Sequence, residues 1–205
     1  MPETEGRQIF LLSPARAGGP RYSMLIREQA DFDLARKLRE GSATIGEVYS
    51  FISGLYFRGK MVYVERFGAA PAGVPPALVI VPGAGLVPPE TVVTIEQLEA
   101  ISEIPVAEEN EAFREPLTQG AKLLNQYAGD CSYVLLGSVA SAKYTAPLLE
   151  VFGDRLLFPI DFVGRGDMSR GGLMLRQARS GVELPYVPVQ GARLHGSRPP
   201  RLKRG

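Results

Sequence analysis

The chain has 205 residues, of which 45% are hydrophobic and 22% charged, with a formal net charge of +1, which fits a single soluble globular domain. No apolar run approaches the roughly 20 residues that span a bilayer, and the polar, acidic start MPETEGRQ does not resemble a secretory signal. The single cysteine, Cys131, and the single histidine, His195, exclude an internal disulfide and argue against a zinc site. We therefore expect a cytoplasmic protein with no membrane association, no metal and no cofactor.

The first half of the chain alternates apolar runs with helical patterns. A continuous apolar, β-branched run at residues 77–81 predicts a central strand buried on both faces. Thr44 and Glu47 form the pattern of a helix-capping box, and Gly54 and Gly59 suggest a break between two helices. The predicted elements are a strand at residues 8–13, a loop at 14–20, helices at 32–38, 44–55 and 60–67, a strand at 77–81 and the loop PGAGLVPP at 82–89.

The second half continues the alternation. Thr94 and Gln97 repeat the capping-box pattern, Pro147 limits or kinks the helix around it, and Gly181 is a helix stop signal. The predicted elements are helices at residues 94–101 and 113–127, a strand at 132–137, a helix within 138–153, a strand at 155–158, a helix at 173–179 and an edge strand at 183–189.

This order of elements predicts the fold class. Strands alternate with helices, and the strand runs do not alternate in polarity, as in sheets that are buried on both faces. We expect one α/β domain over residues 1–190, with a mainly parallel or mixed central sheet flanked by helices. Residues 191–205 hold five basic residues and no acid, which predicts a disordered, flexible basic tail able to reach nucleic acid by charge alone. The alternative is a solvated terminus without a function.

A glycine-rich, arginine-bearing segment, VGRGDMSRGGLMLR at residues 163–176, is the strongest candidate for a ligand site. Arg165 and Arg170 are fork-shaped donors that match phosphate, and Gly166 permits close approach of the backbone. Ser169 is predicted to cap the helix that follows, whose N-terminus favours anions. The alternative is a structural loop whose arginines cap carbonyls or pair with acids such as Asp161.

Two further groups of residues fit a nucleotide or nucleic acid. Tyr56, Arg58 and Lys60 lie close together, so a basic pair can hold phosphate while a ring stacks on a base. The alternative places the aromatic residues of this stretch in the core and Arg58 on the surface.

The second group lies in GSVASAKY, which begins at a predicted strand end and supplies Ser138, Lys143 and Tyr144. Lys143 can neutralise an anion or act as a nucleophile, or it is an ordinary surface lysine, and Tyr144 can donate to a ligand or stack on it. Asp161 also follows a predicted strand, where it can serve as a general base or orient an arginine.

Several segments resemble, in order, the YaaA-type peroxide-stress protein family. They are residues 49–59, with Tyr56, Arg58 and Gly59 in matching places, LVIVPGAGLVPPETV at 78–92, YVLLGSVASAKY at 133–144 and the arginine-bearing segment at 163–176. The middle stretch is also similar to a related group with a SAKYGLL motif. Ala84 and Val87 stand where the family has a tyrosine and a basic residue. The resemblance implies an α/β fold with a positively charged cleft, and involvement with DNA or with protection from oxidative damage.

Three hypotheses follow for function. The first is a protein that binds DNA phosphates in a cleft lined by Arg58, Lys60, Lys143, Arg165 and Arg170. The second is an enzyme acting on a nucleotide or nucleobase, such as a glycosidic-bond hydrolase or transferase, in which Tyr56 or Tyr144 stacks on the base and Asp161 assists. The third is an interaction module whose glycines serve packing only. The partner is thus nucleic acid or a phosphate-bearing small molecule, and the sequence does not define the oligomeric state.

Overall fold

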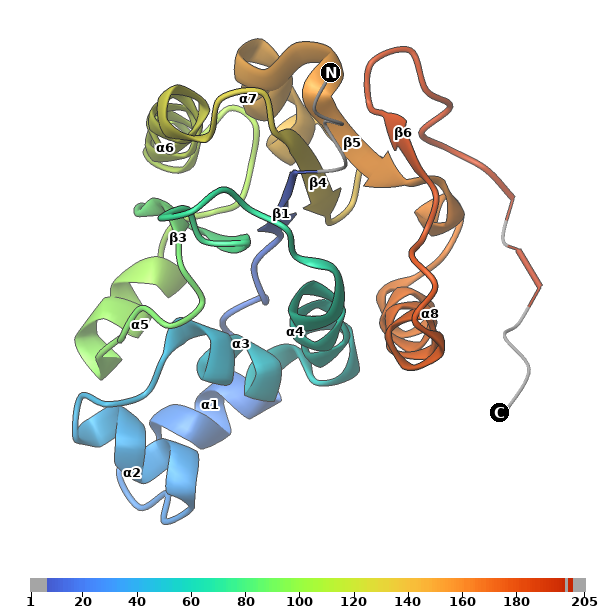
Figure 1. The fold of residues 1–205 in the computed structure, drawn as a ribbon. Helices are drawn as coiled ribbons and strands as arrows, with labels where there is room; N and C mark the ends of the chain where they lie inside the picture. Colours follow the sequence, from blue (N-terminus) through green and yellow to red (C-terminus); the bar gives the residue numbers. More distant parts are fainter. Residues whose placement is uncertain (1–6, 198, 201–205) are drawn as a thin grey trace.

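A computed structural model describes residues 7–197 and 199–200, which form a central sheet between two layers of helices (Figure 1). The strands are β1 Gln8–Leu12, β2 Ala77–Val81, β3 Gly85–Val87, β4 Ser132–Leu136, β5 Leu156–Pro159 and β6 Tyr186–Pro188. The α-helices are α1 Pro20–Ile26, α2 Asp33–Arg39, α3 Ile45–Ser53, α4 Leu55–Phe67, α5 Ile95–Ser102, α6 Glu111–Ala128, α7 Ala142–Phe152 and α8 Asp167–Ser180, with 3₁₀ helices η1 Gly153–Arg155 and η2 Ile160–Phe162.

The sheet has the strand order β3-β2-β1-β4-β5-β6. The four inner strands run parallel, and β3 and β6 close the two edges antiparallel to their neighbours. In the register of the centre, Leu11 of β1 lies between Leu78 of β2 and Leu135 of β4. The fold class predicted from the sequence, an α/β domain with a mixed central sheet flanked by helices, is confirmed.

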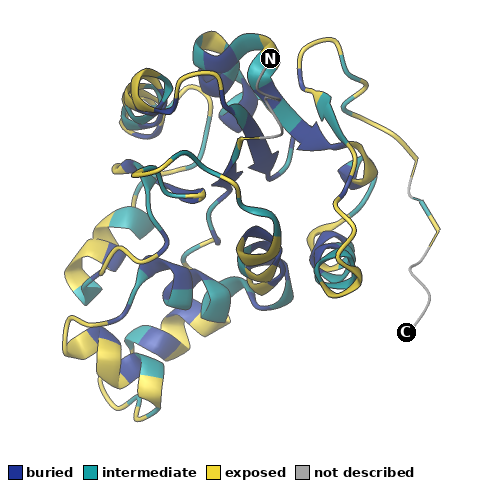
Figure 2. Ribbon diagram, viewed as in Figure 1, coloured by how far each residue is buried: buried dark blue, intermediate teal, exposed yellow. Residues whose placement is uncertain are grey.

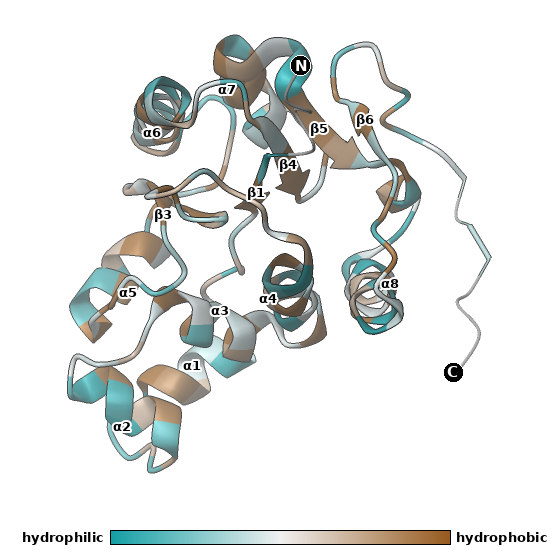
Figure 3. Cartoon of the chain, viewed as in Figure 1, coloured by the Kyte–Doolittle hydropathy of each residue, from teal (hydrophilic) through white to brown (hydrophobic). Residues whose placement is uncertain are grey.

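Both faces of the sheet are buried, as the apolar strand runs predict (Figure 2). Phe10 and Leu12 face the layer that contains α1 to α5 and α8, whereas Ile9 and Leu11 face α6 and α7. Figure 3 shows brown, hydrophobic strands at the centre and hydrophilic residues on the outer helices. Burying an aliphatic or aromatic side chain contributes about 1.5–3 kcal/mol, so these two cores fix the sheet and the strand ends with it.

The helix starts predicted from capping boxes are confirmed. The Oγ1 atom of Thr44 accepts from the backbone N–H of Glu47 at 3.3 Å, and the Glu47 carboxylate accepts from the N–H of Thr44 at 2.9 Å. Thr94 and Gln97 repeat the arrangement at α5, with distances of 3.3 and 2.9 Å. Gly181 ends α8 in the left-handed conformation, as predicted.

Other local predictions are wrong. The loop at 82–89 contains the edge strand β3, and α1 lies in a segment for which no helix was predicted. The break between α3 and α4 falls at Gly54 alone, and Gly59 lies inside α4. Helix α7 runs through Pro147 to its end at Phe152, so the proline does not terminate it.

Helix α8 begins six residues earlier than predicted, at Asp167, with Gly166 as its N-cap and no side-chain cap. The prediction that Ser169 caps this helix is therefore wrong. Ser169 is the third helical residue, and its Oγ accepts instead from Nη1 of Arg165 at 3.2 Å.

The segment beyond β6 is only partly described. Within it, Ala192 and Leu194 pack against the core on the α6 and α7 side, and Arg193 donates to the carbonyl of His195 at 3.1 Å. Residues 198 and 201–205, which include four of the five basic residues of the predicted tail, lie outside the described residues. None of the helices in the described ranges combines the length and apolar character needed to cross a bilayer.

Helices α4 and α8 cross with their backbones in contact. A Cβ atom on Gly171 would lie 2.7 Å from the carbonyl oxygen of Leu55 and 2.8 Å from Cα of Tyr56, and one on Gly59 would lie 2.7 Å from the Gly171 carbonyl oxygen. Only glycine fits at these two positions, because the opposing atoms are backbone and cannot rotate away. Gly171, one of the glycines of the arginine-bearing segment, thus serves the packing of α8 against α4.

We predict that Gly171→Ala lowers the free energy of unfolding by about 1–3 kcal/mol, since overpacking forces the two backbones apart. Urea unfolding followed by circular dichroism measures the change. Gly166→Ala is the matched control in the same segment, since a Cβ there meets nothing within 4 Å. Equal loss in both variants would contradict the close crossing.

Candidate functional site

The parallel strands end at a topological switch point. From β1 the chain passes to β2 on one side, whereas β4 lies on the other side of β1 and β5 lies beyond it. Connections on opposite sides leave a crevice between the loops that follow β1 and β4, where α/β proteins usually bind ligands. The loop after β1 begins at Ser13, and the loop after β4 begins at Gly137.

Two adjoining hollows of about 470 and 300 Å³ open at this place. Both are lined by Pro14, Ala15 and Arg16 after β1 and by Lys143 and Tyr144 at the start of α7. The larger hollow has an apolar wall whose residues come from the end of β2 and from the end of α5 and the segment after it: Pro82, Ile101, Ile104, Pro105 and Val106. The smaller hollow has further lining residues that come from the segments just after β1 and β4, from α3 and α4, and from the start of α8: Ser13, Ile52, Ser53, Tyr56, Ser138 and Asp167. We call the two hollows together the switch-point crevice.

The crevice combines two cations with a helix N-terminus. Arg16 is exposed, and Lys143 is half-buried with its Nζ 5.1 Å from the ring centre of Tyr144. Helix α7 begins at Ala142, and its N-cap Ser141 makes no side-chain capping hydrogen bond. Free N–H groups at such an end favour an anion. Asp167, the first residue of α8, adds one carboxylate to the smaller hollow.

Two tyrosines form the inner wall. Tyr56 and Tyr144 are each 6% exposed. The hydroxyl of Tyr56 is buried without a hydrogen-bond partner among the described residues. Burial raises the pKa of Tyr56 to about 12, against a smaller opposing effect of Arg170, and burial also raises the pKa of Tyr144. Both groups are therefore neutral donors at physiological pH, and leaving one buried without a partner costs about 1–3 kcal/mol.

A buried lysine lies directly behind the crevice. Nζ of Lys60 is 2.8 Å from the carbonyl oxygen of Ser13 and 2.8 Å from its Oγ, and it lies 4.1 Å from the ring centre of Tyr56. No ion pair within 4 Å joins Lys60 to a carboxylate of the described part of the chain. Burial lowers the pKa of Lys60 to about 7, an effect that Asp167 opposes and Arg170 reinforces.

The arginine-bearing segment places its two guanidinium groups on backbone carbonyls. Arg170 is buried, and its Nε and Nη2 donate to the carbonyl of Phe162 at 3.3 and 3.2 Å. Nε of Arg165 donates to the carbonyl of Asp161 at 2.9 Å. Both guanidinium groups thus cap carbonyls, which is the alternative that the sequence left open, and neither lines the crevice.

The remaining candidates are divided between the crevice and other places. Ser138, Lys143, Tyr144 and Tyr56 meet at the crevice, although they come from two separate segments. Arg58 and Asp161 are exposed and line neither hollow, Gly166 is exposed at the start of α8, and Lys60 is buried behind the wall. Among described residues no group of three or more metal-ligating side chains is found.

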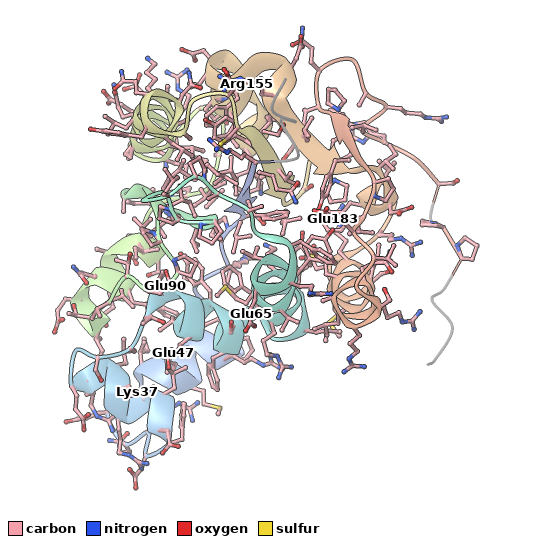
Figure 4. The ribbon with its side chains drawn as sticks, viewed as in Figure 1. Lys37, Glu47, Glu65, Glu90, Arg155 and Glu183 are labelled. Atoms are coloured by element: carbon pink, nitrogen blue, oxygen red, sulfur yellow. The ribbon has the colours of Figure 1, made fainter. Side chains whose placement is uncertain are left out.

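Sequence reasoning missed Ser13 and gave Arg16 no role. The available signal was position, because Ser13 directly follows the apolar run that becomes β1 and Arg16 lies three residues further on. Charged side chains elsewhere hold elements of the fold together. Lys37 pairs with Glu47 at 2.7 Å, and Arg155 donates to the carbonyl of Gly129 at 2.7 Å (Figure 4). None of these residues lines either hollow.

Comparison with known proteins identifies no relative. No family model matches the chain, and neither the curated proteins nor the solved structures include a significant match. Function therefore has to be argued from the crevice itself.

The buried lysine gives a prediction for stability against pH. The unfolded side chain titrates near 10.5 and the folded one near 7, so between these values the unfolded state binds more protons and stability rises with pH. We expect the free energy of unfolding to rise by about 1–2 kcal/mol from pH 7 to 8.5, and Lys60→Met to remove the rise. Urea unfolding at both pH values measures it, and an equal rise in the variant would show that Lys60 is protonated in the folded state.

Proposed function

We propose that the switch-point crevice binds a phosphate-bearing ligand of the nucleotide type. The observation that carries this proposal is the convergence of Arg16, Lys143 and the uncapped start of α7 on one open hollow at the switch point. Arginine, lysine and free backbone N–H groups are the donors that proteins use for phosphate. Residues 1–190 carry more acidic than basic side chains, so Arg16 and Lys143 form a local basic pair rather than part of a generally positive surface.

The rest of the ligand has room beside the phosphate position. The larger hollow has an apolar wall on the side of Ile101, Ile104 and Val106, which suits the faces of a planar ring. Tyr56 lines the smaller hollow, and its buried hydroxyl has no partner among the described residues, so a ligand oxygen that reached this hydroxyl would satisfy it. A phosphate group joined to a planar ring describes a nucleotide.

The resemblance to the YaaA-type family supports the same place. Each of the four stretches that carry the resemblance contributes a residue to the crevice: Tyr56, Pro82, Tyr144 and Asp167 respectively. The family's implied involvement with DNA makes a nucleotide within a single strand an alternative form of the same ligand. We favour a free nucleotide, because Arg58, Arg165 and Arg170 do not extend the basic surface of the crevice.

Ligand binding predicts a thermal shift. Mononucleotides at 100 times the Kd stabilise the folded state by about 2.7 kcal/mol, which raises the Tm by several degrees in a chain of this size. Differential scanning fluorimetry with AMP, GMP, CMP, UMP and inorganic phosphate measures the shift. The double variant Arg16→Ala with Lys143→Ala should lose it.

Arg114→Ala with Lys122→Ala is the matched control, because it removes the same charges from the exposed side of α6. Loss of the shift in both double variants would indicate a general charge effect. The absence of any shift at millimolar nucleotide would contradict the proposal.

Binding of DNA has a distinct salt dependence. Two cations in the crevice predict a slope of log K against log salt of about −1 to −2 for a single strand. Fluorescence anisotropy with a labelled 12-nucleotide strand between 50 and 300 mM salt measures the slope. A slope of −5 or steeper would assign binding to a broad basic surface and would contradict the crevice as the site.

A further inference from the structure

Ser13 and Lys60 form a hydrogen-bonded pair at the inner end of the switch-point crevice. Nζ of Lys60 lies 2.8 Å from Oγ of Ser13, and Ser13 lines the smaller hollow. The serine sits at the carboxyl end of β1, and the lysine reaches it from α4. A hydroxyl that meets a ligand cavity on one side and a buried amine on the other has the arrangement of an activated nucleophile.

The local structure holds both groups in place. A Cβ on Gly137 would lie 2.9 Å from Cβ of Ser13 and 3.2 Å from its Oγ, so glycine at the end of β4 leaves the room that the serine occupies. On the other side, the close crossing at Gly59 and Gly171 fixes the turn of α4 that carries Lys60. The pair therefore depends on two positions where a larger residue does not fit.

Packing alone does not account for the lysine. Lys60 is 1% exposed, and a buried ammonium without a carboxylate partner costs several kcal/mol. A neutral amine avoids that cost. Nζ of Lys60 donates to the Ser13 carbonyl and to Ser13 Oγ, and that Oγ donates to the carbonyl of Leu136 at 3.4 Å, which is long for a hydroxyl hydrogen bond. When the amine is neutral, the Oγ–H can leave the carbonyl and donate to Nζ, as a nucleophile does to its general base.

We propose that Ser13 is a nucleophile and Lys60 its general base, acting on an acyl ester or amide that the crevice admits. Only the identity of the substrate, an acyl derivative of a phosphate-bearing compound, rests on the proposed function. Serine–lysine pairs of this kind perform acyl transfer on unrelated folds. Tyr56 lines the same hollow, and its buried hydroxyl, which has no hydrogen-bond partner among the described residues, is the candidate donor to the oxygen that becomes negative.

The reaction balances without a co-reactant other than water. Oγ of Ser13 forms a bond to the carbonyl carbon while its proton passes to Nζ of Lys60. The bond from that carbon to the leaving oxygen or nitrogen then breaks, and the leaving atom takes the electron pair and the proton from Lys60. Water next attacks the acyl-serine and gives its proton to Lys60, and the returning Oγ recovers that proton as the acid departs.

The charged groups around Lys60 determine its pH dependence. On α8, Asp167 raises the pKa of Lys60 and Arg170 lowers it. On α4, the ring centre of Tyr56 lies 4.1 Å from Nζ of Lys60. Burial, the largest effect, lowers the pKa of Lys60 to about 7. The base is therefore largely neutral above pH 7, and the nucleophilic rate should rise through that value to a plateau.

A small alkyl fluorophosphonate tests the pair without a known substrate. Its phosphorus bonds to an activated serine oxygen and fluoride leaves, while the general base takes the proton. Trypsin then releases residues 8–16, QIFLLSPAR, in which Ser13 is the only serine, so mass spectrometry assigns the label directly. We expect labelling of Ser13, with a rate that rises about tenfold from pH 5 to 6 and levels off above pH 8, as for a base with an intrinsic pKa near 7.

Lys60→Met keeps the volume and removes the amine. Its labelling rate should fall by about 100-fold or more, whereas Lys122→Met on the exposed face of α6 should label at the unaltered rate. Circular dichroism and the Tm report whether each variant is folded. A folded protein that leaves Ser13 unlabelled, or a folded Lys60→Met variant that labels at the full rate, would overturn the proposal.

Ser13→Cys supplies a second measurement that does not require the Lys60→Met variant to fold. Next to Lys60, the thiol should react with iodoacetamide with an apparent pKa below the usual value of about 8.5, and a value at or above 8.5 would count against the pair. Adding AMP to the labelling reaction separates the two proposals. If Ser13 is labelled at the same rate with and without AMP, the result supports Ser13 as a nucleophile and contradicts nucleotide binding in the crevice.

Discussion

The close crossing of α4 and α8 is the constraint on which the site depends. Gly59 and Gly171 bring the two helix backbones into contact, so neither helix can rotate or slide without a steric clash. On α4, Tyr56, Gly59, Lys60 and Tyr63 follow the spacing of one helical face, and all four are buried. The crossing turns that face toward the carboxyl end of β1, where Lys60 meets Ser13 and Tyr56 reaches the crevice.

The central sheet provides the second fixed part of the site. Because β1 lies between β2 and β4 and both of its faces are buried, the position of Ser13 is set by strand register rather than by loop conformation. Its backbone N–H donates to the carbonyl of Leu136 at 3.3 Å, which continues the pairing of β1 and β4 by one residue. Arg16 and Lys143 are then carried by the loop and the helix that leave these two strands.

The sequence predicted the architecture well because its signals are local. Apolar runs defined the inner strands, and the side chains of Thr44 and Glu47 that begin α3 are three residues apart. The edge strand β3 was missed because it has only three residues and lies among glycines and prolines. The early start of α8 was missed because Gly166, a residue without a capping side chain, precedes it.

The site could be predicted only in part, because its members are joined by tertiary packing. The sequence identified Tyr56, Ser138, Lys143 and Tyr144, which do meet at the crevice. It also singled out Arg165 and Arg170, since guanidinium groups among glycines suit phosphate as well as they suit backbone carbonyls. Only the distances to the Phe162 and Asp161 carbonyls separate the two roles. The partner of Lys60 is 47 residues away in sequence, and no spacing rule links them.

Two groups that destabilise the folded chain lie at the crevice, whereas the buried, unpaired hydroxyls of Tyr49 and Tyr133 line neither hollow. A buried amine without a carboxylate partner and the unpaired hydroxyl of Tyr56 both destabilise the folded chain. The amine bonds to Ser13, and Tyr56 lines the same hollow as Ser13. A sequence selected for stability alone would place a methionine at Lys60 and a phenylalanine at Tyr56, which would remove both costs. Perturbed groups of this kind gather where a protein binds or transforms a ligand. Their position at the end of β1, where fold topology independently places a ligand, is the physical reason to regard Ser13, Lys60 and Tyr56 as one functional unit.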